Sequence, residues 1–89
     1  LIITAPDSFH QFKKLLGDGS RLGIKLEYKI QEVARGLADA FIIGEDFISD
    51  KSVCLILGDN IFYGHGLIEK VKTAMKINSG AAIFCQQVK

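Results

Sequence analysis

The sequence predicts an α/β fold in which a parallel sheet is covered by helices. Hydrophobic residues make up 48% of the 89 residues and charged residues 24%, a composition typical of a packed globular chain. Short apolar segments alternate along the chain with amphipathic segments of helical spacing, and such alternation is typical of parallel sheets. One apolar segment, residues 53–57, is uninterrupted, as expected for a strand that is covered on both faces.

The first elements are predicted in the order strand, helix, strand. Residues 1–5 form an apolar run that predicts a buried strand, and Pro6 with Asp7 predicts a turn and a helix N-cap. A short amphipathic helix should follow and end at Gly17. Residues 24–31 then alternate strictly between apolar and polar, so we expect a strand with one buried face at the edge of the sheet.

The second half of the chain predicts two more helices and two more strands. Apolar residues at helical spacing predict a helix over residues 37–48 and another over residues 67–75. Residues 53–57 and 81–85 are the predicted strands. Because the sequence contains no repeat, linker or low-complexity tract, we expect residues 1–89 to belong to a single domain. The apolar strands at both ends lead us to expect that this domain is truncated at both ends.

Charge and cysteine content exclude several classes of function. The 11 basic and 10 acidic residues give a net charge of +1 and form no basic block, so we expect neither nucleic acid nor a membrane as partner. No apolar run approaches the roughly 20 residues of a membrane span. Cys54 and Cys85 lie in predicted strands and lack the spacing of a metal site. With no leader pattern at the start, we expect a cytoplasmic protein with reduced thiols.

Polar residues follow two of the predicted strands, at the carboxyl ends where parallel sheets bind ligands. Asp59 follows the strand at 53–57, where a carboxylate is well placed to bind Mg²⁺, although a simple turn at 58–60 explains the same residues. Gln31 ends the alternating strand. Its amide has the donors and the acceptor to pair with a nucleobase, and Gly36 lets a backbone approach a ring closely. Gln31 is equally explained as one more solvated residue of its strand.

Three segments carry further information through their order and spacing. They are Leu-Leu-Gly-Asp-Gly-Ser at 15–20, Gly-Leu-Ala-Asp-Ala-Phe-Ile-Ile-Gly at 36–44 and Leu-Gly-Asp-Asn-Ile-Phe-Tyr-Gly-His at 57–65. Together they resemble the glucose-1-phosphate thymidylyltransferases, and the similarity covers nearly the whole chain. The resemblance implies an internal fragment from the N-terminal half of such an enzyme. Its fold would be a partial Rossmann-like nucleotidyltransferase domain that lacks its first, central strand.

The resemblance also implies a reaction and a base-binding site. In this family a sugar phosphate attacks the α-phosphate of deoxythymidine triphosphate (dTTP), and pyrophosphate leaves. The residues that match those holding the thymine are Gln31, Gly36 and Leu37. The expected partners are therefore dTTP and glucose 1-phosphate.

Other roles follow from the same resemblance. Asp59 matches the residue that binds Mg²⁺ beside the nucleotide, and Tyr63 and Gly64 match a regulatory nucleotide site near a subunit interface. The family tends to form tetramers. Its glycine-rich loop, catalytic Lys and sugar site have no counterpart in these 89 residues, so we assign no catalytic residue and expect the chain alone to be inactive.

Three alternatives stay open. An adenylyl- or uridylyl-transferring relative is one, because residues 32–35 read Glu-Val-Ala-Arg where the family often has prolines, which should leave the base pocket less rigid. A phospho-receiver-like signalling module is another, since it also binds Mg²⁺ at an Asp after a buried strand. However, Asp7 stands alone after the first strand, without the acidic pair of such modules. The third is a non-catalytic, structural fragment of the enzyme.

Overall fold

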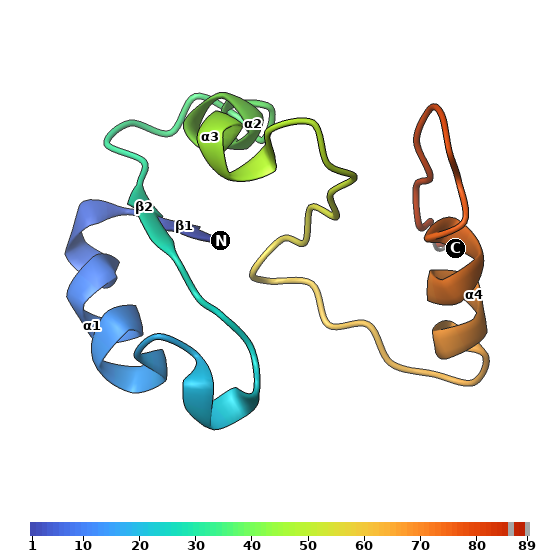
Figure 1. The fold of residues 1–89 in the computed structure, drawn as a ribbon, viewed down its shortest axis with the longest axis horizontal. Coiled ribbons are helices and arrows are strands. Elements are labelled where there is room, and N and C mark those ends of the chain that lie inside the picture. Colours follow the sequence, from blue (N-terminus) through green and yellow to red (C-terminus); the bar gives the residue numbers. More distant parts are fainter. Residues whose placement is uncertain (86, 89) are drawn as a thin grey trace. The chain divides into compact units, whose positions relative to one another are not determined.

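The computed structural model describes residues 1–85 and 87–88 (Figure 1). The chain forms two compact units, Leu1–Cys54 and Leu55–Lys89. The first unit contains a two-stranded parallel sheet with helices, and the second contains a helix with irregular chain before and after it. The α/β class is therefore confirmed in its simplest form, a parallel strand pair accompanied by helices.

The sheet consists of strands β1 (Ile2–Thr4) and β2 (Tyr28–Ile30), which run parallel. One further hydrogen bond extends the ladder at each end. The N–H of the first residue of β1 donates to the Glu27 carbonyl at 2.8 Å, and the Gln31 N–H donates to the carbonyl of the last residue of β1 at 2.9 Å. The backbone of Gln31 is thus fixed as a continuation of the sheet.

The strand predicted over residues 24–31 is shorter than expected. Its first residues pair with the preceding loop instead of with β1. The Ile24 N–H donates to the Gly19 carbonyl at 3.2 Å, and the Leu26 N–H donates to the Asp18 carbonyl at 2.8 Å. Because β1 itself has three residues, it offers a partner only to the end of the alternating segment.

Helix α1 (Pro6–Leu16) connects the two strands, as predicted. Its N-cap is Ala5, so the predicted turn at Pro6 and cap at Asp7 are wrong. Proline is suited to the first helical position because the N–H that it lacks has no partner there. Asp7 lies in the first turn and Lys13 in the last, and each charge has the sign that the helix dipole favours at its end.

Aromatic and polar contacts fasten α1 to β2. The rings of Phe9 and Tyr28 meet edge to face with their centroids 6.1 Å apart, and the Lys13 ammonium lies 5.6 Å from the Phe9 centroid. The Tyr28 hydroxyl donates to the Gly17 carbonyl just past the helix, at 2.7 Å. The contacts of Tyr28 with Phe9 and Gly17 join the helix to the neighbouring strand near the beginning and at the end of the helix.

A tight loop follows α1 and contains the 3₁₀ helix η1 (Ser20–Leu22). Gly19 and Gly23, with φ of 83° and 71°, flank η1 in the left-handed region. The Asp18 carboxylate accepts the Ser20 N–H at 3.0 Å, and this hydrogen bond lowers the pKa of the Asp18 carboxyl below its ordinary value.

The helix predicted over residues 37–48 is divided into α2 (Asp39–Ile43) and α3 (Glu45–Ile48). The division falls at Gly44, where φ is −89° and ψ is 5°. Glycine has low helix propensity because it loses the most backbone freedom on ordering. The chain nevertheless turns compactly here, since the Gly44 N–H donates to the Ala40 carbonyl at 2.9 Å.

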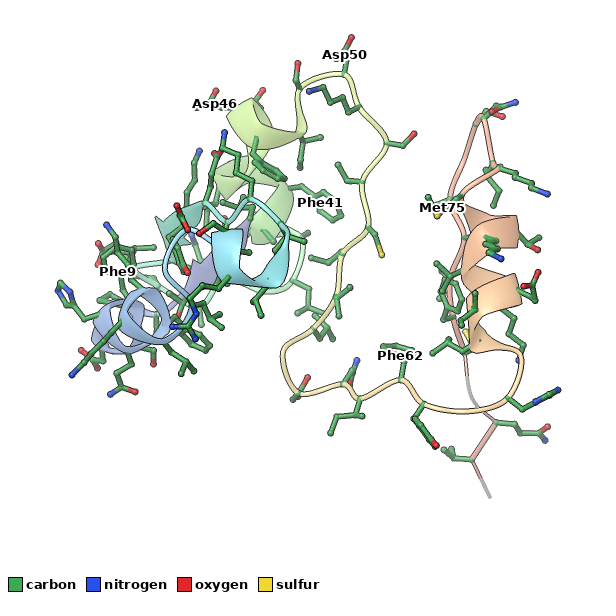
Figure 2. The ribbon with its side chains drawn as sticks, turned by 60° about the horizontal axis from the view of Figure 1, so that its bottom comes forward. Phe9, Phe41, Asp46, Asp50, Phe62 and Met75 are labelled. Carbon is green, nitrogen blue, oxygen red and sulfur yellow. The ribbon has the colours of Figure 1, made fainter. Side chains whose placement is uncertain are left out.

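One lysine links these helices to the sheet. The Lys29 ammonium, which belongs to β2, donates to the Ile43 carbonyl at the end of α2 at 2.8 Å. The same ammonium lies 3.6 Å from the Asp46 carboxylate on α3, a residue labelled in Figure 2. A cation is favourable at this position because the carbonyls at a helix C-terminus lack partners.

Helix α4 (Leu67–Ala74) lies in the second unit and confirms the helix predicted over residues 67–75. Its N-cap is Gly66, with φ of 77°. Beside it, the rings of Phe62 and Phe84 meet edge to face with centroids 6.4 Å apart. This contact connects the segments before and after the helix.

The strands predicted at residues 53–57 and 81–85 are wrong. Both segments lie outside any ladder, and side chains stand along the irregular chain between α3 and α4 in Figure 2. An apolar run indicates that side chains would be buried in a strand, but a strand also needs a neighbour for its backbone hydrogen bonds. No described residue offers one. Cys54 and Cys85 are consequently exposed free thiols instead of core residues.

The described residues bury no hydrophobic side chain. The buried side chains in this part of the chain are polar, those of Thr4 and Asp39, with 9% and 6% of their area exposed. Large apolar residues are exposed in both units. No helix formed by residues 1–85 and 87–88 has the length and apolar character that crossing a membrane requires.

Candidate functional site

The loop between β2 and α2 contains the predicted base-binding residues (Figure 1). Gln31 is the first residue of this loop, and its backbone is held by β1. Its side chain points to the start of α2, where the Gln31 Nε2 donates to Oδ2 of Asp39 at 2.9 Å. Both ends of Gln31 are therefore fixed, the backbone by the sheet and the amide by a helix.

Asp39 is the residue that organises this loop, and sequence reasoning overlooked it. Its side chain is buried, and its Oδ2 also lies 3.6 Å from the Nε of Arg35. A carboxylate removed from water needs donors or cations around it, and Gln31 and Arg35 supply one of each. The four-residue spacing of Arg35 and Asp39 is the pattern in the sequence that points to this pair.

Gly36 and Leu37 precede Asp39 in the same loop. The Gly36 carbonyl accepts the Asp39 N–H at 3.3 Å. Gly36 has φ of 96°, and a Cβ built on it would meet no atom within 4 Å, so the space beside its backbone is open. Leu37 is 62% exposed. The structure thus brings the Gln31 amide and the Gly36 backbone to one buried carboxylate, and it leaves the neighbouring Leu37 exposed.

Asp59 lies in the second unit, in a turn closed by the Asn60 N–H donating to the Leu57 carbonyl at 3.2 Å. The interpretation of residues 58–60 as a turn is confirmed. The expected position at the end of a strand is wrong, because residues 53–57 form none. That Asp59 and Gln31 share one edge of a sheet stays a prediction.

An open cleft of about 1060 Å³ brings the other predicted residues together within the second unit. Asp59, Tyr63 and Gly64 all line it, together with residues of α4 and Phe84. Tyr63 is 99% exposed, so its ring is free to contact a ligand. The cleft therefore offers a carboxylate and an aromatic ring to the same space.

The fit of a metal depends on how many protein ligands it needs. The described residues contain no group of three or more His, Cys, Asp or Glu side chains that could hold an ion. Mg²⁺ commonly keeps several waters and takes one or two carboxylates plus substrate phosphates. Asp59 fits that mode as a single oxygen donor on the cleft.

Comparison with known proteins shows the family to which the sequence belongs. All 89 residues match the family described as nucleotidyl transferase. Relatives named glucose-1-phosphate thymidylyltransferase include one from Neisseria meningitidis, 53% identical over 89 residues, which are 100% of this chain and 31% of the relative. One from Mycobacterium tuberculosis is 48% identical over 87 residues, 98% of this chain and 30% of the relative. One from Xanthomonas campestris is 45% identical over 84 residues, 94% of this chain and 28% of the relative.

Proposed function

The chain belongs to the nucleotidyl transferase family, and from this membership we propose that it is part of an enzyme that makes dTDP-glucose from dTTP and glucose 1-phosphate. The observation that carries the proposal is the alignment of the whole chain, all 89 residues, with a glucose-1-phosphate thymidylyltransferase at 53% identity. In this reaction a phosphate oxygen of the sugar phosphate bonds to the α-phosphorus of dTTP. The bond from that phosphorus to the bridging oxygen breaks, and pyrophosphate leaves.

Gln31, Gly36 and Leu37 hold the thymine in this proposal. The Gln31 amide pairs with the polar edge of the base, and Leu37 contacts its face. The support is the open space beside Gly36 and the exposure of Leu37, which leave room for a ring next to a fixed amide. Positioning of this kind matters because phosphoryl transfer depends on alignment and charge stabilisation.

Asp59 would hold Mg²⁺ beside the phosphates of the nucleotide. When bound, the ion supplies positive charge that stabilises the charge developing on the transferred phosphoryl group. The support is the donor type of Asp59 and its place on the cleft. We assign no catalytic residue to these 89 residues, and the remaining groups belong to other parts of the enzyme.

Tyr63 and Gly64 would belong to a second, regulatory nucleotide site in the assembled enzyme, which we propose to be a homotetramer. Exposed aromatic rings stack readily on nucleobases. The support is that the Tyr63 side chain is 99% exposed.

Both units would form one nucleotidyltransferase domain with a Rossmann-like parallel sheet. The parallel pairing of β1 and β2 across α1 supports that fold, and the unbroken family match over residues 1–89 supports a single domain. We place the enzyme in the cytoplasm, where the free thiols of Cys54 and Cys85 would stay reduced.

The test uses a full-length enzyme that contains this chain, made by replacing the matching segment of the Neisseria meningitidis relative with all 89 residues. We call it the exchange enzyme. It should release pyrophosphate from dTTP and glucose 1-phosphate in a coupled assay. A folded exchange enzyme that prefers ATP or UTP would contradict the thymidylyl assignment, and one inactive with all three nucleotides would contradict the proposed function.

Two substitutions in the exchange enzyme separate binding from chemistry. Gln31→Ala should weaken selection of dTTP, by roughly 1–3 kcal/mol, because a base-edge hydrogen bond is lost. Asp59→Asn should instead lower kcat steeply with little change in selection. The exposed Asp50→Asn is the matched control for loss of a carboxylate. Unchanged discrimination between dTTP and purine triphosphates in Gln31→Ala would count against the base site.

A further inference from the structure

The pair formed by Gln31 and Asp39 determines which way the amide of Gln31 faces. A carboxylate accepts hydrogen bonds and donates none, so the atom of Gln31 that faces Asp39 must be its NH₂ group. The observed contact, Nε2 to Oδ2 at 2.9 Å, has this orientation. The positions of the Gln31 Oε1 and of the second hydrogen on Nε2 are then fixed as well.

The neighbours of Asp39 make this orientation stable. Its carboxylate is buried, and its Oδ2 also lies 3.6 Å from the Nε of Arg35. Its backbone N–H is bonded to Gly36, while the backbone of Gln31 is bonded to β1. A flip of the amide would place Oε1 against a carboxylate oxygen, and two acceptors in contact repel each other.

Amide orientation distinguishes the two pyrimidines. Thymine offers an N3–H donor beside its O4 acceptor, whereas cytosine offers an N3 acceptor beside its N4–H₂ donor. An amide matches thymine in one orientation and cytosine when flipped. We propose that Asp39 is a positioning residue that sets the preference for thymine over cytosine by holding the Gln31 amide in one orientation. This inference rests on the proposed function, since it assumes that Gln31 pairs with the base.

The test compares dTTP with dCTP as substrates of the exchange enzyme. Asp39→Ala should lower the ratio of kcat/KM for dTTP to that for dCTP roughly tenfold, the effect of one oriented hydrogen bond. The loss should appear mainly as a higher KM for dTTP, with kcat nearly unchanged. Asp39→Asn, whose amide oxygen still accepts from Nε2, should restore most of the ratio. Asp50→Ala removes an exposed carboxylate of the same unit and should leave the ratio unchanged.

A double variant shows whether Asp39 acts through Gln31. If it does, Gln31→Ala with Asp39→Ala should have the same ratio as Gln31→Ala alone. Asp39→Leu fills the buried volume without supplying an acceptor, so it should lower the ratio of kcat/KM for dTTP to that for dCTP as Asp39→Ala does. It replaces Asp39→Ala in the test if that variant does not fold.

Three outcomes would overturn the inference. A normal ratio in both Asp39→Ala and Asp39→Leu, alongside a reduced ratio in Gln31→Ala, would overturn the role of Asp39 and leave the proposed function standing. A normal ratio in Gln31→Ala would overturn the base-binding role of Gln31 and this inference with it. Additive losses in the double variant would show that Asp39 acts by another route.

Discussion

Gly19 occupies a position with no room for a side chain. A Cβ built there would lie 2.7 Å from both the Ile24 carbonyl oxygen and Cγ of Leu26, and φ is 83°. The Gly19 carbonyl also accepts two N–H groups, from Leu22 at 2.9 Å and Ile24 at 3.2 Å. The residue is therefore the point around which the chain turns from α1 into β2.

Gly19→Ala should destabilise the exchange enzyme more than Gly23→Ala does. Both glycines have positive φ, which costs roughly 1–3 kcal/mol for another residue. Only Gly19 adds a collision, since a Cβ on Gly23 would meet no atom within 4 Å. Thermal unfolding of the two variants measures the difference. Equal shifts of the midpoint would show that the loop relaxes around the new methyl group.

Also for single residues, the sequence predicted part of the candidate site but not the role of Asp39 in it. The family resemblance pointed to Gln31 and Gly36, whereas residue type alone left Gln31 equally explained as a solvated strand residue, and the structure brings both to Asp39. Asp39 itself was not recognisable as a site residue, because a charged residue at the start of a helix is usually solvated. Its burial depends on how the loop folds, and residue type alone does not reveal it.

Among the elements, α2 and α3 are attached to the sheet by Lys29, in addition to the bond between Gln31 and Asp39. Its ammonium bonds to the end of α2 at Ile43 and pairs with Asp46 of α3. These helices have five and four residues, too few to be stable without tertiary contacts. The lysine supplies such a contact from the neighbouring strand.

Lys29→Met should loosen α2 and α3 while leaving α1 unchanged. Methionine keeps much of the aliphatic stem but removes the donors, at a cost on the order of 1 kcal/mol for a partly exposed bond. Hydrogen exchange in the exchange enzyme should become faster at residues 40–48. Lys25→Met is the control, since Lys25 forms an exposed pair with Glu27 and should change little. Faster exchange in α1 as well would indicate general destabilisation.

Comparison of the predicted with the observed helices and strands shows which features of the fold the sequence periodicity predicts. The helices at Pro6–Leu16 and Leu67–Ala74 and the parallel pairing of the first two strands agree with the sequence pattern, because the contacts within them are local or join neighbouring elements. Residues 53–57 and 81–85 were predicted as strands on apolar character alone. A strand is completed only by another strand, and hydrophobicity does not say where that partner lies.

For the whole chain, the central fact is that the described residues have no buried hydrophobic side chain. Apolar side chains stay exposed on helices, on loops and on residues 53–57. Exposed apolar surface that goes beyond single scattered residues marks a place where protein covers protein. This chain matches 31% of the length of the Neisseria meningitidis relative. In the proposed enzyme, the rest of that length would cover the exposed apolar side chains.

Residues 1–89 produced as a separate chain should show no thymidylyltransferase activity and should self-associate. Activity requires groups placed around the triphosphate, and these residues offer one candidate metal carboxylate. Exposed apolar surface and an unpaired edge of β1 favour association between copies. Pyrophosphate release measures the activity, sedimentation measures the self-association, and thermal unfolding shows whether the chain unfolds cooperatively. A cooperatively unfolding monomer with turnover above background would contradict this expectation.

Tyr28, whose hydroxyl donates to the Gly17 carbonyl, is an intrinsic spectroscopic probe of the contact between α1 and β2. The sequence has two tyrosines and no tryptophan. Tyr28 is hydrogen-bonded in the first compact unit, whereas Tyr63 is exposed in the second. In a Tyr63→Phe chain all tyrosine absorbance and emission would therefore come from the joint between α1 and β2. The melting of the first unit would then be observed on its own, without any added dye.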